Sequence, residues 1–291
     1  MEPFDPLAHR APPTGEDPDR PFKRFDRETE MKIYGVNACR AVFSARPTDI
    51  IRCYFDQGTA GRFGDIMKYC ARQRLAYHLV PTMDLERISQ TGHHEGVCML
   101  IRKRPMRKLD EFLQEAAGSD TTLVLALEDI RNPFNLGSVM RVAAHFGAAA
   151  IVVRDAQPLH SGAAFRNAEG GVESLEIIEE PDFLDALVRM RSAGFQIVST
   201  AVHQGTNLYG AALSPRAVFV FGDEAFGLTP EAMDAGDLLL QIPGTGFVES
   251  LNVSAAAAVI LGEQWRQVFG ATDLSPEPAP EEDLPPPPPN S

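Results

Sequence analysis

Apolar residues repeat at helical and strand spacings in two successive regions of this chain, and the first region lies within residues 31–105. Ala38, Val42 and Phe43 follow a helical spacing, and residues 50–55 form an apolar run of strand length. A second helical pattern and two further short apolar runs follow, at residues 62–73, 76–80 and 97–101. Helices mixed with strands over so short a span predict a small α/β domain.

The second region, residues 121–270, alternates more regularly. Apolar runs of strand length lie at residues 121–127, 151–153, 197–198, 218–221 and 238–242. Stretches with helical spacing lie between and after them, at residues 136–146, 183–193 and 251–268. Strands that alternate with helices predict an α/β fold with a mostly parallel sheet that is covered on both faces.

Such a sheet is typical of nucleotide-binding domains, and an oxidoreductase that binds a dinucleotide is one reading of it. That reading requires a G-x-G-x-x-G turn after the first strand. The turn here, residues 128–133, reads EDIRNP. The missing glycines therefore count against a dinucleotide site.

The remaining segments have little apolar periodicity. The first 30 residues contain six prolines, and the last 19 contain eight. Such composition predicts a disordered N-terminal extension at 1–30 and a disordered, acidic and proline-rich tail at 271–291. The polar and charged residues 106–120 are predicted to form a linker that ends in a short helix.

Charge is distributed unevenly along the chain, whose net charge is −13. Residues 31–107 carry a net charge of +7, whereas residues 117–272 carry −10. A basic block is expected if one domain holds nucleic-acid phosphate while another performs chemistry. The same charges would also suit an ordinary solvated surface, so charge alone leaves both readings open.

The chain has no apolar run of the roughly 18 residues that a membrane helix needs, and it begins with acidic and proline-rich sequence instead of a signal peptide. We therefore expect a soluble, cytoplasmic protein without a membrane partner. The four cysteines (Cys39, Cys53, Cys70 and Cys98) form no close pair in the sequence. This spacing counts against a zinc ribbon or a disulfide framework, and no metal is expected.

Residues whose side chains could bind a ligand or take part in catalysis are concentrated in the loops that follow three of the predicted strands. The first loop and the helix after it read NPFNLGSVMR over residues 132–141, where Asn135 is a plausible helix N-cap and Arg141 could clamp a phosphate. The second reads FGDEAFGL over 221–228, with Glu224 between two glycines that allow a ligand close to the backbone.

The third loop, residues 242–254, reads IPGTGFVESLNVS and connects a strand to the last helix. Ser250 and Asn252 fall at the start of that helix, where side chains and free N–H groups can cap the helix or bind a ligand. Each loop by itself also fits an ordinary turn, cap or solvated side chain. Their common position at the carboxyl ends of parallel strands is what points to a ligand site.

Together the three loops resemble the three motifs of the SpoU family, within the SPOUT class of RNA methyltransferases. The first motif is matched by Asn135, Gly137 and Arg141, and the second, G-x-E-x-x-G, by Gly222, Glu224 and Gly227. The third, an I-P loop that ends in S-L-N-V-S, is matched by Ile242, Pro243 and residues 250–254. Order and spacing agree across residues 121–268. Residues 31–104 also resemble the family's RNA substrate-binding domain, and residues 162–171, GAAFRNAEGG, look closest to one bacterial subgroup of tRNA/rRNA methyltransferases.

The resemblance implies a C-terminal trefoil knot that holds S-adenosylmethionine (SAM), a homodimer, and methyl transfer to a ribose 2'-hydroxyl of rRNA or tRNA. It implies that Arg141, Asn135, Glu224, Ser250 and Asn252 are catalytic. It implies cofactor contacts from Gly222, Glu224, Ile242, Gly246, Leu251 and Asn252. Ala225 and Phe226 stand where many members carry a further glycine, and Gly244 where a larger apolar residue is common. A non-catalytic RNA-binding or assembly protein that keeps this fold is the alternative.

Overall fold

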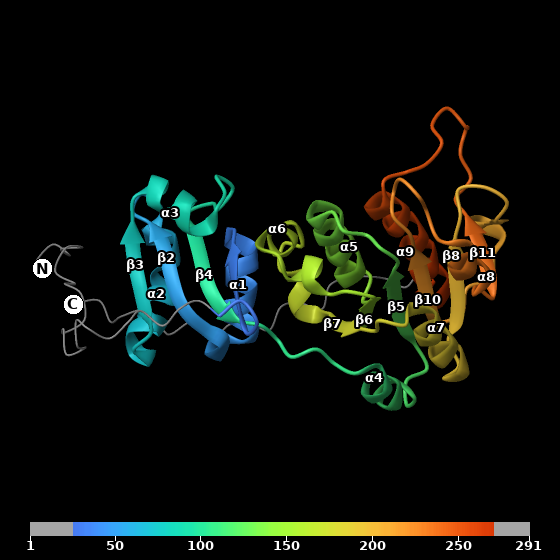
Figure 1. Ribbon diagram of the computed structural model, residues 1–291, viewed down its shortest axis with the longest axis horizontal. Helices are drawn as coiled ribbons and strands as arrows, with labels where there is room; N and C mark the ends of the chain where they lie inside the picture. The colour runs from blue at the N-terminus through green and yellow to red at the C-terminus, as the bar shows by residue number, and fades with distance from the viewer. Residues whose placement is uncertain (1–25, 271–291) are drawn as a thin grey trace, which may run out of the picture.

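The computed structural model describes residues 26–270, which form two β-sheets joined by helices (Figure 1). The disorder expected for residues 1–25 and 271–291 lies outside the described residues. The predicted N-terminal extension reached too far, because strand β1 (Glu30–Tyr34) already begins at Glu30. Glu30 pairs with Arg102 on the neighbouring strand, and its carboxylate accepts a hydrogen bond from the backbone N–H of Asp26 at 3.2 Å.

The first sheet has four strands in the order β1-β4-β2-β3. Its other strands are β2 (Ile50–Asp56), β3 (Ala76–Val80) and β4 (Val97–Arg102). Strand β4 runs antiparallel to both β1 and β2, whereas β2 and β3 are parallel. Helices α1 (Val36–Ala45), α2 (Gly64–Gln73) and α3 (Thr82–Ser89) complete this unit, and the first two lie side by side through an edge-to-face contact of Phe43 with Tyr69. The small mixed α/β unit expected from the sequence is therefore present.

The second sheet has seven strands in the order β7-β6-β5-β10-β8-β11-β9, and each pairing between neighbours is parallel. The strands are β5 (Thr122–Leu127), β6 (Ala150–Val153), β7 (Glu176–Glu179), β8 (Gln196–Thr200), β9 (Thr206–Asn207), β10 (Arg216–Phe221) and β11 (Leu238–Gln241). The prediction of a mostly parallel sheet is confirmed. The sequence pattern missed β7 and β9, because β7 is flanked by acidic residues and β9 has only two residues.

Two apolar layers cover the two faces of this sheet. Val124 and Ala126 of β5 face one layer, which contains α4 (Leu109–Ala116), α7 (Phe183–Ser192) and α8 (Pro230–Asp234). Leu125 and Leu127, which alternate with them, face the other layer, which contains α5 (Pro133–His145), α6 (Gly162–Asn167) and α9 (Val253–Phe269). Both faces of each central strand are therefore apolar, as expected for a covered parallel sheet.

The layer with α5 and α9 continues into the first sheet without a break. Figure 1 shows α1, α6, α5 and α9 in a row that crosses from one sheet to the other. A single cluster of buried side chains includes Ile33 and Val42 from the first unit and Phe165, Met140 and Ile260 from the second. The two sheets therefore share one apolar core. None of the helices within residues 26–270 is long and apolar enough to span a membrane.

Candidate functional site

The three loops singled out in the sequence meet at one edge of the seven-stranded sheet. They follow β5, β10 and β11, and because these strands are parallel, their carboxyl ends lie at the same edge. Figure 1 shows the third of them, residues 242–252, rising above the sheet between β11 and α9. The predicted convergence of the loops is therefore observed.

A chain of side-chain amides connects the three loops. The Nδ2 of Asn252 donates a hydrogen bond to Oδ1 of Asn135 at 3.0 Å. The Nδ2 of Asn135 donates in turn to the carboxylate of Glu224. Asn135 thus joins residues that are 89 and 117 positions away in the chain. Because an amide carries both a donor and an acceptor, Asn135 can link a carboxylate on one side to an amide on the other.

The start of α5 differs from the expectation in one respect. The N-cap is Asn132, whose Oδ1 accepts from the N–H of Phe134 at 2.9 Å, and Pro133 occupies the first helical position. Pro133 fits there because the first N–H of a helix has no partner in the helix. Asn135 therefore lies inside the first turn and is not the cap, which leaves its side chain available for the amide chain.

Asn252 is the N-cap of α9, whereas the sequence had placed both Ser250 and Asn252 at the start of this helix. Its Oδ1 accepts from the N–H of Ser254 at 3.0 Å and from the Ser254 hydroxyl at 2.6 Å. The same side chain therefore ends the loop, begins the helix and holds Asn135. Ser250 lies before the helix and is exposed, and it makes no hydrogen bond through its side chain within residues 26–270.

The loop after β10 is a tight turn that needs glycine at both ends. A Cβ on Gly222 would lie 2.2 Å from the carbonyl carbon and oxygen of Gly227, and Gly227 itself has φ of +69°. The N–H of Gly227 donates to the backbone carbonyl of Asp223 at 2.8 Å, and the N–H of Ala225 donates to the side-chain carboxylate of Asp223 at 2.8 Å. This closed turn presents Glu224 towards Asn135 and leaves Phe226 91% exposed.

The loop after β11 offers an unusual length of free backbone. Residues 243–251 are all exposed, and among the described residues their backbone makes one hydrogen bond, from the N–H of Phe247 to the Thr245 hydroxyl at 3.4 Å. Gly246 adopts φ of +79°, which bends the loop at its middle. Polar backbone atoms without partners are the groups that can read the edge of a bound base or ribose.

Arg141 lies beside this network, not within it. It is on α5, six residues after Asn135, and its side chain is exposed. A Cβ on Gly171 would lie 3.4 Å from its Cα, so Arg141 emerges next to the turn that follows α6. No residue between positions 26 and 270 forms an ion pair or hydrogen bond with its guanidinium group, which leaves all five of its donors free.

Glu128 is a residue at this edge that the sequence analysis did not single out. It follows β5 directly and is 2% exposed. Its carboxylate accepts from the N–H of Thr229 at 2.8 Å and from the Thr229 hydroxyl at 2.9 Å, with Arg154 at 3.6 Å. Glu128 thereby fixes the turn after β10 to the end of β5. An acidic residue immediately after an apolar strand was the signal that could have identified it.

The basic block of residues 31–107 is only partly available to a nucleic acid. Arg46 and Arg104 both bind the buried carboxylate of Glu173, at 2.8 and 2.6 Å, and Arg107 is paired with Glu115. These arginines balance acidic residues of the second unit instead of facing solvent. Lys68 and Arg72 of α2 and Arg74, which follows the helix directly, are exposed and have no acidic partner among residues 26–270.

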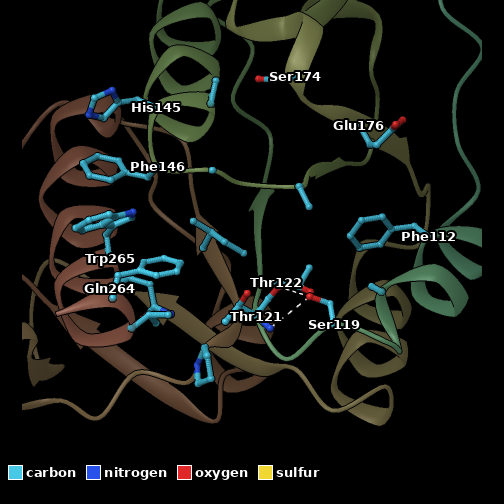
Figure 2. Close-up of a pocket in the computed structure, with 18 of the residues that line it drawn as sticks. Phe112, Ser119, Thr121, Thr122, His145, Phe146, Ser174, Glu176, Gln264 and Trp265 are labelled. Atoms are coloured by element: carbon cyan, nitrogen blue, oxygen red, sulfur yellow. Dashed lines mark hydrogen bonds between the residues drawn. The ribbon is translucent and has the colours of Figure 1, made fainter. Parts of the chain in front are cut away.

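A groove of about 610 Å³ lies at the opposite edge of the same sheet, where β5 and β7 begin (Figure 2). Its walls include His145, Phe146 and Trp265 on one side and Phe112 on the other. None of the predicted site residues lines it. Within the described part of the chain, no group of three or more His, Cys, Asp or Glu side chains is arranged to hold a metal ion.

Comparison with known families gives two matches along the chain. A model of the SpoU rRNA Methylase family matches residues 122–262. A model described as RNA 2'-O ribose methyltransferase substrate binding matches residues 32–106. The two matches coincide with the seven-stranded and four-stranded units.

Individual relatives cover most of the chain. The uncharacterized tRNA/rRNA methyltransferase YfiF of Escherichia coli O157:H7 is 43% identical over 84% of this chain and 70% of its own length. An uncharacterized tRNA/rRNA methyltransferase of Haemophilus influenzae is 34% identical over 82% of this chain and 67% of its own length. The 23S rRNA (guanosine-2'-O-)-methyltransferase RlmB of Neisseria meningitidis is 28% identical over 82% of this chain and 96% of its own length.

Solved structures share the arrangement of both sheets. The crystal structure of an RNA 2'-O ribose methyltransferase superposes with a TM-score of 0.68 at 24% identity, covering 84% of this chain and 93% of that one. The AdoMet-bound rRNA methyltransferase of Sinorhizobium meliloti superposes with a TM-score of 0.66 at 22% identity, covering 83% and 88%. At these identities the similarity establishes the shared α/β fold.

Proposed function

Because this chain belongs to the SpoU rRNA methylase family, we propose that it transfers a methyl group from SAM to a ribose 2'-hydroxyl of a structured rRNA or tRNA. The observation that carries the proposal is the amide chain from Asn252 through Asn135 to Glu224. It joins one residue from each of the three motifs at the edge of the sheet where ligands of parallel α/β folds bind.

The residues at this edge are suited to SAM. The free backbone of residues 243–251 can hydrogen-bond an adenine, and the turn closed by Gly222 and Gly227 lets a ligand approach the main chain. We assign Gly222, Glu224, Ile242, Gly246, Leu251 and Asn252 to cofactor binding. SAM, when bound, supplies a methyl group on a positively charged sulfur. We further propose that the chain around these loops is threaded as a trefoil knot.

Arg141 is the residue we assign to the RNA. Its exposed guanidinium has five donors in a planar fork that matches a phosphate. Held near the target nucleotide, it would stabilise negative charge that develops on the 2'-oxygen as this oxygen takes the methyl group and its proton passes to solvent water. Asn135, Glu224, Ser250 and Asn252 would orient the ribose and align its oxygen with the methyl group.

The absence of Arg141 from the amide chain favours a site shared between two copies. Arg141 contributes nothing to the hydrogen-bonded network of its own chain, although both belong to the same motif set. We propose a homodimer in which Arg141 of one copy faces the RNA held at the loops of the other. The basic residues of the 32–106 unit would then hold the RNA further from the reacting ribose.

The proposal is tested with purified protein, SAM carrying a labelled methyl group, and tRNA and rRNA from a strain that lacks the gene. Nucleoside mass spectrometry of the product identifies the methylated atom and the base. We expect a 2'-O-methylnucleoside that is absent without protein. Binding of RNA without methyl transfer, together with no binding of SAM by calorimetry, would instead support the non-catalytic RNA-binding alternative.

A further inference from the structure

Residues 161–171 form a bridge between the two sheets, and no part of the site described above explains their sequence. Ser161 caps α6 by accepting from the N–H of Ala164 at 3.2 Å, and Gly170 turns the chain with φ of +94°. This segment, called here the α6 bridge, packs against α5 on one side and against β1 and α1 on the other. Figure 1 shows α6 between α1 and α5.

Glycines bring the α6 bridge into direct backbone contact with both neighbours. A Cβ on Gly137 of α5 would lie 2.5 Å from the carbonyl oxygen of Ala164. A Cβ on Gly162 would lie 2.5 Å from the ring of Tyr34, on β1. Both distances are shorter than real contacts allow, so neither interface accepts a side chain at these positions. The bridge therefore has little room to move relative to either unit.

An ion pair in which two nitrogens of Arg166 share one carboxylate oxygen connects the bridge to the first unit. Arg166 binds the Oε1 atom of Glu95 through Nε at 3.0 Å and through a terminal nitrogen at 2.7 Å. The Oε2 atom of the same carboxylate accepts from the N–H of Val36, at the start of α1, at 2.9 Å. Glu95 holds this position with φ of +54°, a conformation that is uncommon for glutamate. Next to it, Asn37 donates to Glu169 of the bridge.

The other end of the bridge reaches the helix that carries the RNA-facing arginine. Gly171, at the end of the bridge, lies against α5. A Cβ on Gly171 would be 2.9 Å from the Cβ of Ala144 and 3.4 Å from the Cα of Arg141. A rigid path therefore runs from Glu95 through Arg166 and α6 to the backbone of Arg141. On the far side of Glu95, α1 packs against α2 with its exposed Lys68 and Arg72.

We infer that Arg166 and Glu95 are positioning residues for RNA selection, which fix the distance between the basic surface of α2 and Arg141. This inference rests on the proposed function. When the distance between α2 and Arg141 is fixed, the protein binds best to a folded RNA in which the distance between a helix and the target ribose is the same. The phosphates of that helix can then contact α2 while the ribose lies near Arg141. A short single strand cannot engage both places at once, so it gains nothing from the fixed distance.

The first test measures the distance itself. The four native cysteines are buried, so spin labels can be placed selectively on Gln73→Cys in α2 and Val188→Cys in α7, with singly labelled samples to remove distances between copies. We expect one narrow distance distribution in the full chain. Arg166→Ala and Glu95→Gln should broaden it, whereas Arg266→Ala, which removes the ion pair with Glu263 within α9, should not. An unchanged distribution in both bridge variants would overturn the inference.

The second test measures affinity, so it does not require methyl transfer. Mixed tRNA and rRNA are compared with the same RNA after partial alkaline hydrolysis to short fragments. We expect Arg166→Ala to weaken binding of intact RNA about tenfold, which corresponds to about 1.4 kcal/mol, while binding of the fragments and of SAM is unchanged. Equal losses on intact and fragmented RNA would overturn the inference. A full chain that selects intact RNA through the bridge but methylates none would contradict only the proposed function.

Discussion

The side-chain amide of Asn252, at the start of α9, donates to the side-chain oxygen of Asn135, on α5, at 3.0 Å. Asn135 is only half buried, so this hydrogen bond sits at the rim of the sheet and not in its core. A contact at the rim adds little to stability, whereas it fixes the relative position of two loops. Its main effect should therefore be on catalysis.

The amide chain can be tested with single and double substitutions. Asn135→Ala and Asn252→Ala should each lower kcat about 10- to 100-fold, because a small misplacement of reacting groups is costly. The double variant should lose little more than the worse single variant, since both substitutions break the same connection. Initial rates of methyl transfer at saturating SAM and RNA provide the measurement. Losses that multiply would contradict a shared role.

Arg141 should matter for rate far more than for folding. Arg141→Ala removes the one assigned charge at the developing oxyanion, and we expect kcat to fall about 100- to 1,000-fold with the melting temperature unchanged. Arg131→Ala is the matched control, because Arg131 is also exposed and lies at the same edge of the sheet. An equal loss in the Arg131 variant would indicate that positive charge in general, not Arg141 itself, supports the reaction.

A site shared between two copies makes a specific prediction for mixed dimers. The slow Arg141→Ala and Asn252→Ala chains, mixed and allowed to exchange, should reach about a quarter of the wild-type rate, above either variant alone (roughly half of the chains in mixed dimers, each with one intact site). Sedimentation should show a dimer in each sample. Activity that stays at the level of the separate variants would place the whole site within one chain.

The contact between α5 and α6 should tolerate no added methyl group. Gly137→Ala places a Cβ 2.5 Å from a backbone oxygen, and we expect a loss of about 1–3 kcal/mol in the free energy of unfolding. Gly64→Ala in α2 is the control, because no atom outside its chain neighbours and its own helix backbone would lie within 4 Å of an added Cβ, and its φ is −60°. That variant should be neutral or slightly stabilised. Urea unfolding followed by circular dichroism compares the two.

Glu263 should contribute to stability in a pH-dependent way. Hydrogen bonds from Arg266 and Gln267 lower the pKa of this carboxyl from its ordinary value of 4.5 to about 2. The contribution is therefore present above about pH 4.5 and is lost as the pH falls through about 2. Glu263→Gln should cost about 1 kcal/mol near neutral pH, a modest value because Arg266 is largely exposed. Urea unfolding should show this difference vanishing towards pH 2; a constant difference would contradict the assignment.

Much of the fold could be predicted because apolar runs mark buried strands directly. Residues 121–127 and 218–221 gave the two central strands β5 and β10 within a residue or two. Strand β7 escaped because its apolar pair, Ile177 and Ile178, is enclosed by glutamates, which are tolerated near the edge of the sheet. Strand β9 at the opposite edge has two exposed residues and no apolar signal at all.

The sequence predicted which loops form the site, but it did not predict all of the side-chain contacts within and around it. Parallel strands bring loops together at one edge, which correctly anticipated the meeting of Asn135, Glu224 and Asn252. The prediction that Asn135 caps α5 was wrong. Both Asn132 and Asn135 are residue types that suit an N-cap, and Pro133, which favours the first helical position, decides between them. The charge pattern could not show that Arg46 and Arg104 neutralise Glu173, since that pairing depends on how the two sheets pack.

The two sheets are held together by the apolar side chains that they share, so we expect them to stay associated even when the chain between them is cut. Residues 103–108 run between β4 and α4 outside any helix or strand, and Met106 in this stretch is 41% exposed. A protease cut there would leave both fragments held by the buried side chains around α1, α6 and α5. The two halves are therefore expected to reassemble as separately synthesised polypeptides, in the manner of a split protein.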